Sequence, residues 1–210
     1  RTGDIVPLES TGGEAANGNS YSLKITKNGD YYSQKTAEGV KLHDMMRVPY
    51  GIEHNPSSLN NAHVNSWFVD YGHGLLGGTS DYETPIKTVH EMGGLSVINH
   101  PGEYTGARDE DETADAYDYS DTMYKYYIDK FVGLLTEYDS CIGIDINSKG
   151  DSRTRYDRKL WDILLQKVTP TGRNVLAIAT SDAHSTNAVY TGYTEMLMPS
   201  LTEDNFRKSL

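Results

Sequence analysis

Several apolar runs in this chain stop at a side chain that can bind a metal ion. These side chains are Glu53, His100, and the pair Asp182 and His184. Short apolar runs bounded by turn-forming residues are typical of buried β-strands. Ligand sites in α/β folds form where the strands end. The pattern therefore predicts a strand-rich core with a metal-binding edge.

The pair Asp182 and His184 follows the apolar run 175–180. In an extended chain, side chains two residues apart point to the same side. The pair would then direct an oxygen and a nitrogen at one point, a mixture that divalent metals accept. The alternative is a turn with an exposed histidine.

His100 lies between the strand-like run 95–99 and a proline, which stops a strand. Its alternative role is that of a hydrogen-bonded core histidine. Glu53 closes an earlier run and can instead cap a loop or pair with Arg47. A buried charge needs compensation, and a metal ion is the better partner for Glu53.

Three weaker candidates accompany these residues. His63 begins a strand and is equally well explained as a ligand or as an ordinary polar residue. Asp145 and Asn147 alternate along a strand, so one can be a ligand while the other donates a hydrogen bond to it. His54 follows Glu53 and points to the other face if the strand continues, so we expect it to be peripheral.

Strands and helices alternate from residue 48 onward. The expected strands are 48–53, 62–70, 95–99, 141–147, 175–180 and a short one near 193–198. The expected helices are 84–92, 120–138 capped by Ser120, 156–168 and a last one capped by Thr202, with a weak helix at 36–46. This order predicts a mainly parallel sheet or barrel.

The 210 residues fit a single domain, 1–210, with room for a sizeable core. The alternation around Asn28-Gly29 predicts a hairpin insertion at 21–33. The stretch 103–121 is rich in carboxylates and predicts a solvated loop, because it lacks the spacing of a calcium-binding loop.

Composition limits the partners of the chain. A net charge of −11 repels phosphate backbones and makes nucleic-acid binding unlikely. No apolar run approaches the roughly 18 residues that a membrane span needs. The single cysteine, Cys141, favours a reducing compartment, and no apolar signal core follows Arg1. We expect a cytoplasmic protein, although a start upstream of Arg1 would leave a signal peptide possible.

Several enzyme classes lack their signatures here. The sequence contains no Gly-x-Ser-x-Gly elbow, no Walker loop, no Gly-x-Gly-x-x-Gly fingerprint and no Cys-x-x-Cys pair. Cys141 lies inside a strand, where a nucleophile would be poorly placed.

The motifs, taken in order, resemble the polymerase and histidinol phosphatase (PHP) family of metal-dependent phosphoesterases. The matching segments are Pro49-Tyr50-Gly51-Ile52-Glu53, Ala62-His63-Val64, Gly93-Gly94 through His100-Pro101, Gly143-Ile144-Asp145-Ile146-Asn147, and Thr180-Ser181-Asp182-Ala183-His184-Ser185. The likeness covers about residues 48–210. The His-Pro and Ser-Asp-Ala-His segments are the specific ones.

The resemblance implies a distorted TIM-like (β/α)7 barrel that holds up to three zinc, manganese or iron ions. Glu53 would bridge two metals, His63 and His100 would complete one site, Asp182 would bind the neighbouring metal and His184 a third. The metals would lower the pKa of a bound water from about 16 toward 7 and neutralise phosphoryl charge. The expected substrate is a small phosphorylated metabolite or a nucleotide, with Glu53, Asp182 and His184 as catalytic residues.

The chain departs from the family pattern in three places. It has no His-x-His strand, it carries Asp145 where the family has Glu, and Gly102-Glu103-Tyr104 follows His-Pro where an arginine is frequent. Arg108, Arg153 or Arg155 can supply the missing phosphate contact. We expect this chain to lack the first and the closing strand of the barrel, which would make it a weakly active fragment.

Two other functions remain open. A degenerate, non-catalytic binding or regulatory domain is the main alternative, because the His-x-His strand is absent. A proofreading-type exonuclease is the other, although the charge of −11 disfavours it. The oligomeric state is left open by the sequence.

Overall fold

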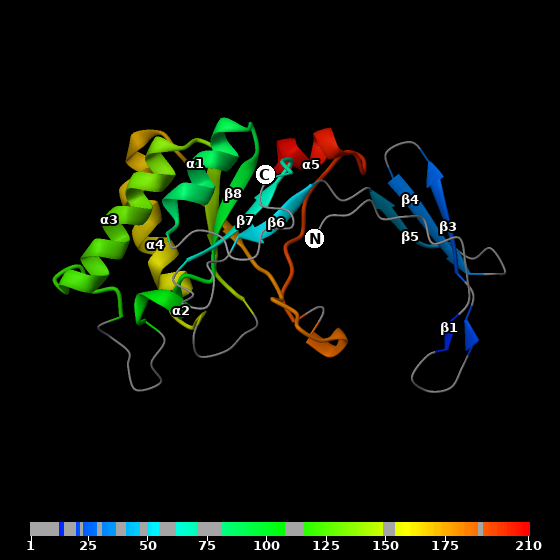
Figure 1. Cartoon of the computed structure of the whole chain (residues 1–210), viewed down its shortest axis with the longest axis horizontal. Coiled ribbons are helices and arrows are strands. Elements are labelled where there is room, and N and C mark those ends of the chain that lie inside the picture. Colours follow the sequence, from blue (N-terminus) through cyan, green and yellow to red (C-terminus); the bar gives the residue numbers. More distant parts are fainter. Residues whose placement is uncertain are drawn as a thin grey trace. The chain divides into compact units, whose positions relative to one another are not determined.

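The structure, a computed structural model, describes residues 13–14, 20–21, 23–28, 31–36, 41–46, 50–54, 62–70, 81–107, 116–148, 154–188 and 191–210. The chain divides into two compact units (Figure 1). One comprises residues 1–50 and 196–210, and the other comprises residues 51–195.

The first unit contains strands and one short helix. β1 (Gly13–Glu14) pairs with β2 (Ser20–Tyr21), and β3 (Leu23–Asn28), β4 (Tyr31–Thr36) and β5 (Lys41–Met46) form an antiparallel sheet in that order. Asn28 pairs with Tyr31 in the segment expected to form a hairpin. The weak helix expected at 36–46 is wrong, because β5 occupies much of it. Helix α5 (Glu203–Ser209) is capped by Thr202, as expected, since its hydroxyl oxygen accepts from the Asn205 amide.

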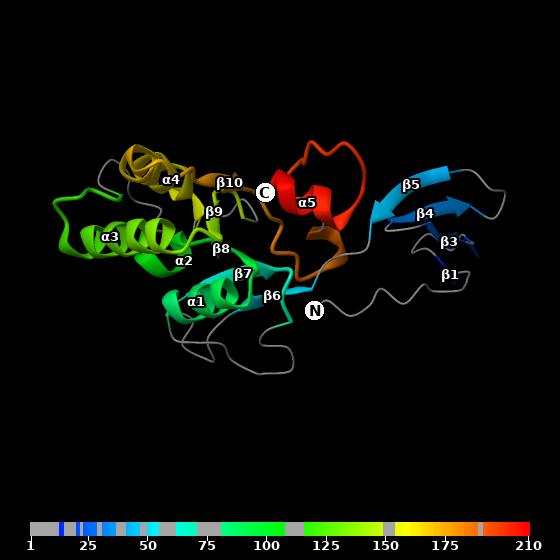
Figure 2. The same cartoon turned by 90° about the horizontal axis from the view of Figure 1, so that it is seen from above.

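The second unit is built on a five-stranded sheet with the order β10-β9-β8-β7-β6 (Figure 2). Its strands are β6 (Gly51–His54), β7 (His63–Trp67), β8 (Leu95–Asn99), β9 (Cys141–Asp145) and β10 (Leu176–Ile178). β6, β7 and β8 pair antiparallel, whereas β8, β9 and β10 pair parallel.

The predicted TIM-like barrel is therefore wrong. The sheet is mixed and open, with β6 and β10 at its two edges. The link 55–62 between β6 and β7 is too short for the crossover that parallel strands need, so an antiparallel pair forms instead. The longer link between β7 and β8 holds a helix but still returns the chain antiparallel. The alternation of strands and helices did not fix strand direction.

Helices of the second unit cover one face of the sheet (Figure 1). They are α1 (Glu83–Glu91), the short α2 (Gly102–Thr105), α3 (Thr122–Glu137) and α4 (Asp157–Val168), which the 3-10 turn η2 (Thr169–Thr171) follows. A further 3-10 turn, η3 (Thr186–Ala188), comes after β10. The expected helices lie close to α1, α3 and α4. No strand forms near 193–198 in the described part of that segment.

The helix starts show which polar groups satisfy the free backbone amides. Asp121, not the expected Ser120, caps α3, because its carboxylate accepts from the amides of Met123 and Tyr124. At α1, Asp81 accepts from the Thr84 amide at 2.7 Å. None of the helices in the described ranges is long and apolar enough to cross a membrane.

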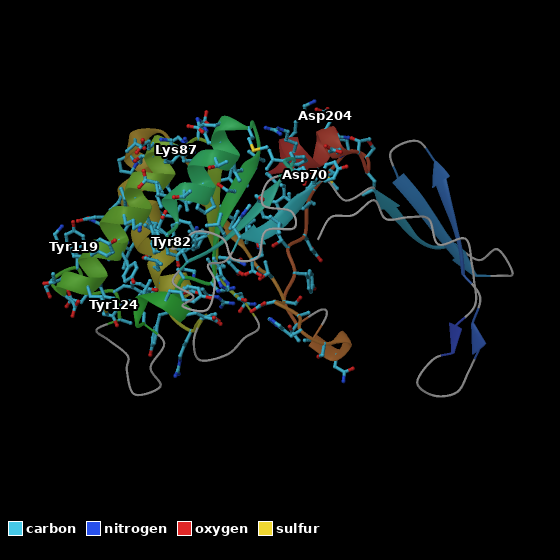
Figure 3. All side chains as sticks on the ribbon, in the orientation of Figure 1. Asp70, Tyr82, Lys87, Tyr119, Tyr124 and Asp204 are labelled. Atoms are coloured by element: carbon cyan, nitrogen blue, oxygen red, sulfur yellow. The ribbon has the colours of Figure 1, made fainter. Side chains whose placement is uncertain are left out.

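The core lies between this helical layer and the sheet. Val64, Ile98 and Ile144 face it from three adjacent strands and pack into one cluster with residues of α1, α3 and α4. Leu164 of α4 is fully buried there, which stabilises the fold by about 1.5–3 kcal/mol. Tyr82 lies inside the helical layer, whereas Tyr119 lies at its outer margin (Figure 3). The other face of the sheet is left to carry polar residues.

Candidate metal centre

Sheet direction brings the candidate ligands to one edge. β6 and β8 run parallel to each other because each is antiparallel to β7. Glu53 lies near the end of β6, and His100 directly follows β8. His63 is the first residue of β7, so the reversed direction of β7 places it at the same edge.

Strand register places these side chains on the face opposite the core. Glu53 pairs with Asn65 and His63 pairs with Asn99 across neighbouring strands, so these four share one face. His100 would point to the other face if the strand continued regularly. Its φ of 22° breaks the alternation, and its ring joins the same group. Backbone strain of this kind is concentrated at functional sites.

Three ligand-type atoms converge on this face. Glu53 Oε1 lies 3.0 Å from His63 Nδ1 and 3.1 Å from His100 Nε2, and the two nitrogens lie 3.3 Å apart. Glu53, His63 and His100 form a group of residues that can hold a metal ion. They are the residues that the sequence assigned to one site.

The triangle of atoms fits a small divalent ion. Metal–nitrogen and metal–oxygen bonds of about 2.0–2.1 Å place tetrahedral ligands about 3.3 Å apart. The observed separations of 3.0–3.3 Å are close to that value. An ion bound to all three atoms would keep a fourth coordination position for water or substrate. Two imidazoles and one carboxylate are a ligand set that zinc, manganese and iron all accept.

The same contacts fix the charges of the metal-free site. Burial raises the pKa of Glu53, but hydrogen bonds and charge from His100 and His63 outweigh it and hold that pKa well below its ordinary value. Burial lowers the pKa of His100, but the hydrogen bond and charge of Glu53 dominate and raise it. Glu53 and His100 thus form an ion pair, and an incoming cation would displace a proton.

One nitrogen of each imidazole lies outside the contacts with Glu53, and the ring of Tyr104 lies beside both imidazoles. His63 Nε2 and His100 Nδ1 are buried and have no hydrogen-bond partner within the ranges that the structure describes. The ring of Tyr104 lies 4.8 Å from that of His63 and 5.8 Å from that of His100, centroid to centroid. Helix α2, which carries Tyr104, is held by the buried carboxylate of Asp157, which accepts from the Gly102 amide at 2.9 Å.

Asp182 reaches the margin of this group, and His184 does not. The Asp182 carboxylate is 4.0 Å from His100 Nε2, and its side chain is 11% exposed. The extended backbone assumed for this pair is absent, because Asp182 has a φ of 43°. His184 Nδ1 instead lies 2.8 Å from the Asp182 backbone oxygen, and its side chain is 83% exposed.

Asp145 bonds to donors of its own chain. Its carboxylate accepts from the Asn147 amide at 3.0 Å and from the Thr180 hydroxyl at 2.5 Å, so it joins the ends of β9 and β10. Burial raises the pKa of Asp145. Asn147 accepts from the guanidinium of Arg158 at 3.4 Å.

The other candidates are placed as follows. Arg155 is exposed beside the ring of Tyr156, and Arg108 and Arg153 lie outside the described residues. His54 points away from Glu53, as expected, and its Nε2 lies 2.7 Å from Ser66 Oγ.

The sequence reasoning missed two asparagines at this centre. Asn99 donates to Glu53 Oε1 at 2.8 Å, and Asn65 donates to Asn99 Oδ1 at 3.0 Å. The sequence contained a sign of this role. Asparagine is depleted in strands, yet Asn65 stands inside an expected strand, two residues after His63. Tyr104 was noted only for standing where an arginine is frequent.

Comparisons of the chain with protein-family models, with curated proteins and with solved structures found no match.

Proposed function

We propose that this chain is a metal-dependent phosphoesterase whose centre is Glu53, His63 and His100. The convergence of these three side chains, with 3.0–3.3 Å between their ligand atoms, carries the proposal. A divalent ion held there would supply Lewis acidity, which lowers the pKa of water and neutralises phosphoryl charge. A four-coordinate catalytic metal needs three protein ligands and one open position, which this set provides.

Asp182 is the proton acceptor next to this centre. Its carboxylate lies 4.0 Å from His100 Nε2, within reach of a water that approaches the open position. The water oxygen forms a bond to phosphorus while the ester P–O bond breaks. Asp182 takes the proton of the water, and the leaving alkoxide takes a proton from solvent. Asp182, whose side chain is 11% exposed, then releases the proton to solvent.

A phosphate ester is the proposed substrate because of the sequence motifs. The order of the Glu53, His63, His100 and Asp182 segments resembles the PHP phosphoesterases. A small ester is favoured over nucleic acid, because a net charge of −11 opposes the approach of a polyanion. The alternative of a non-catalytic binding domain keeps the same ligand set without turnover.

Hydrolysis of p-nitrophenyl phosphate by the full chain, loaded with Zn²⁺, Mn²⁺ or Fe²⁺, tests the proposal. Glu53→Gln removes a charged ligand and should lower kcat/KM more than the 10–100-fold typical of changes behind the ligands. The matched control is Glu91→Gln, an exposed glutamate at the end of α1, near the start of β8 and not its His100 end, which should leave the rate unchanged.

Three results would contradict the proposal. A rate insensitive to chelator and to Glu53→Gln would show that the centre does not act. Metal binding without turnover of any phosphate ester would favour the binding-domain alternative. Faster cleavage of single-stranded DNA, weakened steeply by salt, would favour the exonuclease.

A further inference from the structure

Two asparagine side chains form a chain of hydrogen bonds that ends on the ligand oxygen of Glu53. Asn65 Nδ2 donates to Asn99 Oδ1 at 3.0 Å, and Asn99 Nδ2 donates to Glu53 Oε1 at 2.8 Å. Asn99 is buried and Asn65 is half-buried. The three residues come from three adjacent strands and share one face of the sheet.

Both asparagines occupy positions where strand propensity disfavours them. Asn65 is the middle residue of β7 and Asn99 is the last residue of β8. Asparagine is depleted in strands. A residue that opposes the strand propensity of its position is expected where its side chain contributes to a functional site. Here the two asparagines are linked to the Glu53 carboxylate by hydrogen bonds.

Glu53 Oε1 has three nitrogen neighbours, and they differ in what they can do once a cation binds. His63 Nδ1 and His100 Nε2 must offer lone pairs to the ion, and a nitrogen that does so has no proton left to donate. The amide of Asn99 has no lone pair to offer on nitrogen and keeps its protons. Among the three, Asn99 is the donor that can hold Glu53 in both the free and the bound state.

We infer that Asn99 orients the Glu53 carboxylate for metal binding and that Asn65 acts through Asn99 as a second positioning residue. This inference rests on the metal centre of the proposed function. Asn65 donates to the oxygen of the Asn99 amide and so fixes which end of that amide faces Glu53. With the amide reversed, the Asn99 oxygen would face the carboxylate and repel it.

Asn65→Asp tests this directly, because residue 65 then accepts a hydrogen bond from Asn99 instead of donating one to it. An aspartate at 65 accepts, so it competes with Glu53 for the NH2 group of Asn99 and draws that group away from the carboxylate. The inference predicts that Zn²⁺ affinity, measured by competition with a chelating dye, falls by about 10–100-fold. A simple charge effect predicts the opposite, since an added negative charge attracts the cation.

Two further variants complete the test. Asn99→Leu removes the donor at similar volume and should weaken Zn²⁺ binding by the same factor of about 10–100. In the double variant, Asn65→Asp should cause no further loss, because its effect passes through Asn99. The matched control is Asn174→Asp, which adds the same charge at an exposed site and keeps the bond from the Val175 amide.

Metal-free thermal unfolding of each variant, followed by tryptophan fluorescence, verifies folding. If Asn99→Leu does not fold, Asn65→Asp alone decides.

Unchanged or tighter Zn²⁺ binding by Asn65→Asp overturns the inference. An equal loss on adding Asn65→Asp to the parent and to Asn99→Leu also overturns it. If the parent binds Zn²⁺ no better than Glu53→Gln does, the proposed metal centre and this inference are both wrong. If the parent binds Zn²⁺ but hydrolyses no ester, only the proposed function fails.

Discussion

Glu53 and His54 are neighbours in one strand, yet the fold gives them opposite surroundings. Glu53 faces two imidazoles, which hold its pKa below the ordinary range against the effect of burial, and it also accepts from the Asn99 amide. His54 faces the core side, where burial lowers its pKa to about 4. The alternation of a strand thus separates an ionised ligand from a neutral histidine.

His54 predicts a specific dependence of stability on pH. Below about pH 6.5 the unfolded chain binds a proton at His54, whereas the folded chain does so only near pH 4. Stability should therefore fall as pH falls from 6.5 to 4, by up to about 3 kcal/mol from this residue. A His54→Gln variant lacks this loss.

Urea unfolding in chelator, followed by tryptophan fluorescence, measures the difference between the parent and His54→Gln. Both tryptophans, Trp67 and Trp161, lie in the unit 51–195. Glu53 and His100 are present in both proteins, so their own titrations cancel. A difference that stays constant from pH 7.5 to pH 4 would refute the burial of a neutral His54.

At this scale the sequence predicted the residues that converge and missed the two asparagines that are hydrogen-bonded behind Glu53. Glu53 and His100 were marked because each is a ligand type at the end of a strand, and His63 was added because of the resemblance to the PHP family. Asn65 and Asn99 were not, because an amide in a strand becomes informative only once the register is known. The expectation for His184 failed to account for the φ of Asp182, which no pattern of residue types reveals.

Among the elements, β9 and β10 approach each other closely at Gly143. A Cβ at Gly143 would lie 2.1 Å from the backbone oxygen of Leu176. The contact is with backbone, so neither strand can yield without disturbing the pair. Gly133, in the exposed face of α3, has nothing within 4 Å of the same position.

These two glycines predict opposite effects of one substitution. Gly143→Ala should destabilise the chain by about 2 kcal/mol or more, because β10 must shift. Gly133→Ala should stabilise it by about 0.5–1 kcal/mol, because alanine loses less conformational freedom in a helix. Urea unfolding measures both. A Gly143→Ala variant as stable as the parent would show that β10 does not lie where the structure puts it.

The elements themselves were largely predictable from local patterns. Apolar spacing located β8, β9, α1, α3 and α4 within a few residues, and Thr202 was identified as a cap. Strand direction was not predictable in the same way, because it depends on which strands pair. The short link 55–62 was the one local sign that β6 and β7 run antiparallel.

At the scale of the unit 51–195, the expected barrel was wrong but the expected edge forms. The carboxyl ends of β6 and β8 and the start of β7 meet on one side in an open mixed sheet. A barrel would have gathered the strand ends by closure. Here the reversed direction of β7 does so, which is why His63 joins the group from the start of its strand.

Glu53, His63 and His100 are proposed to bind one divalent ion, and anomalous diffraction can locate that ion directly. Crystals of the full chain grown with Zn²⁺ are measured at the zinc absorption edge. We expect one strong peak about 2.0–2.2 Å from Glu53 Oε1, His63 Nδ1 and His100 Nε2. A peak beside Asp182 and His184, with none at these three atoms, would contradict it.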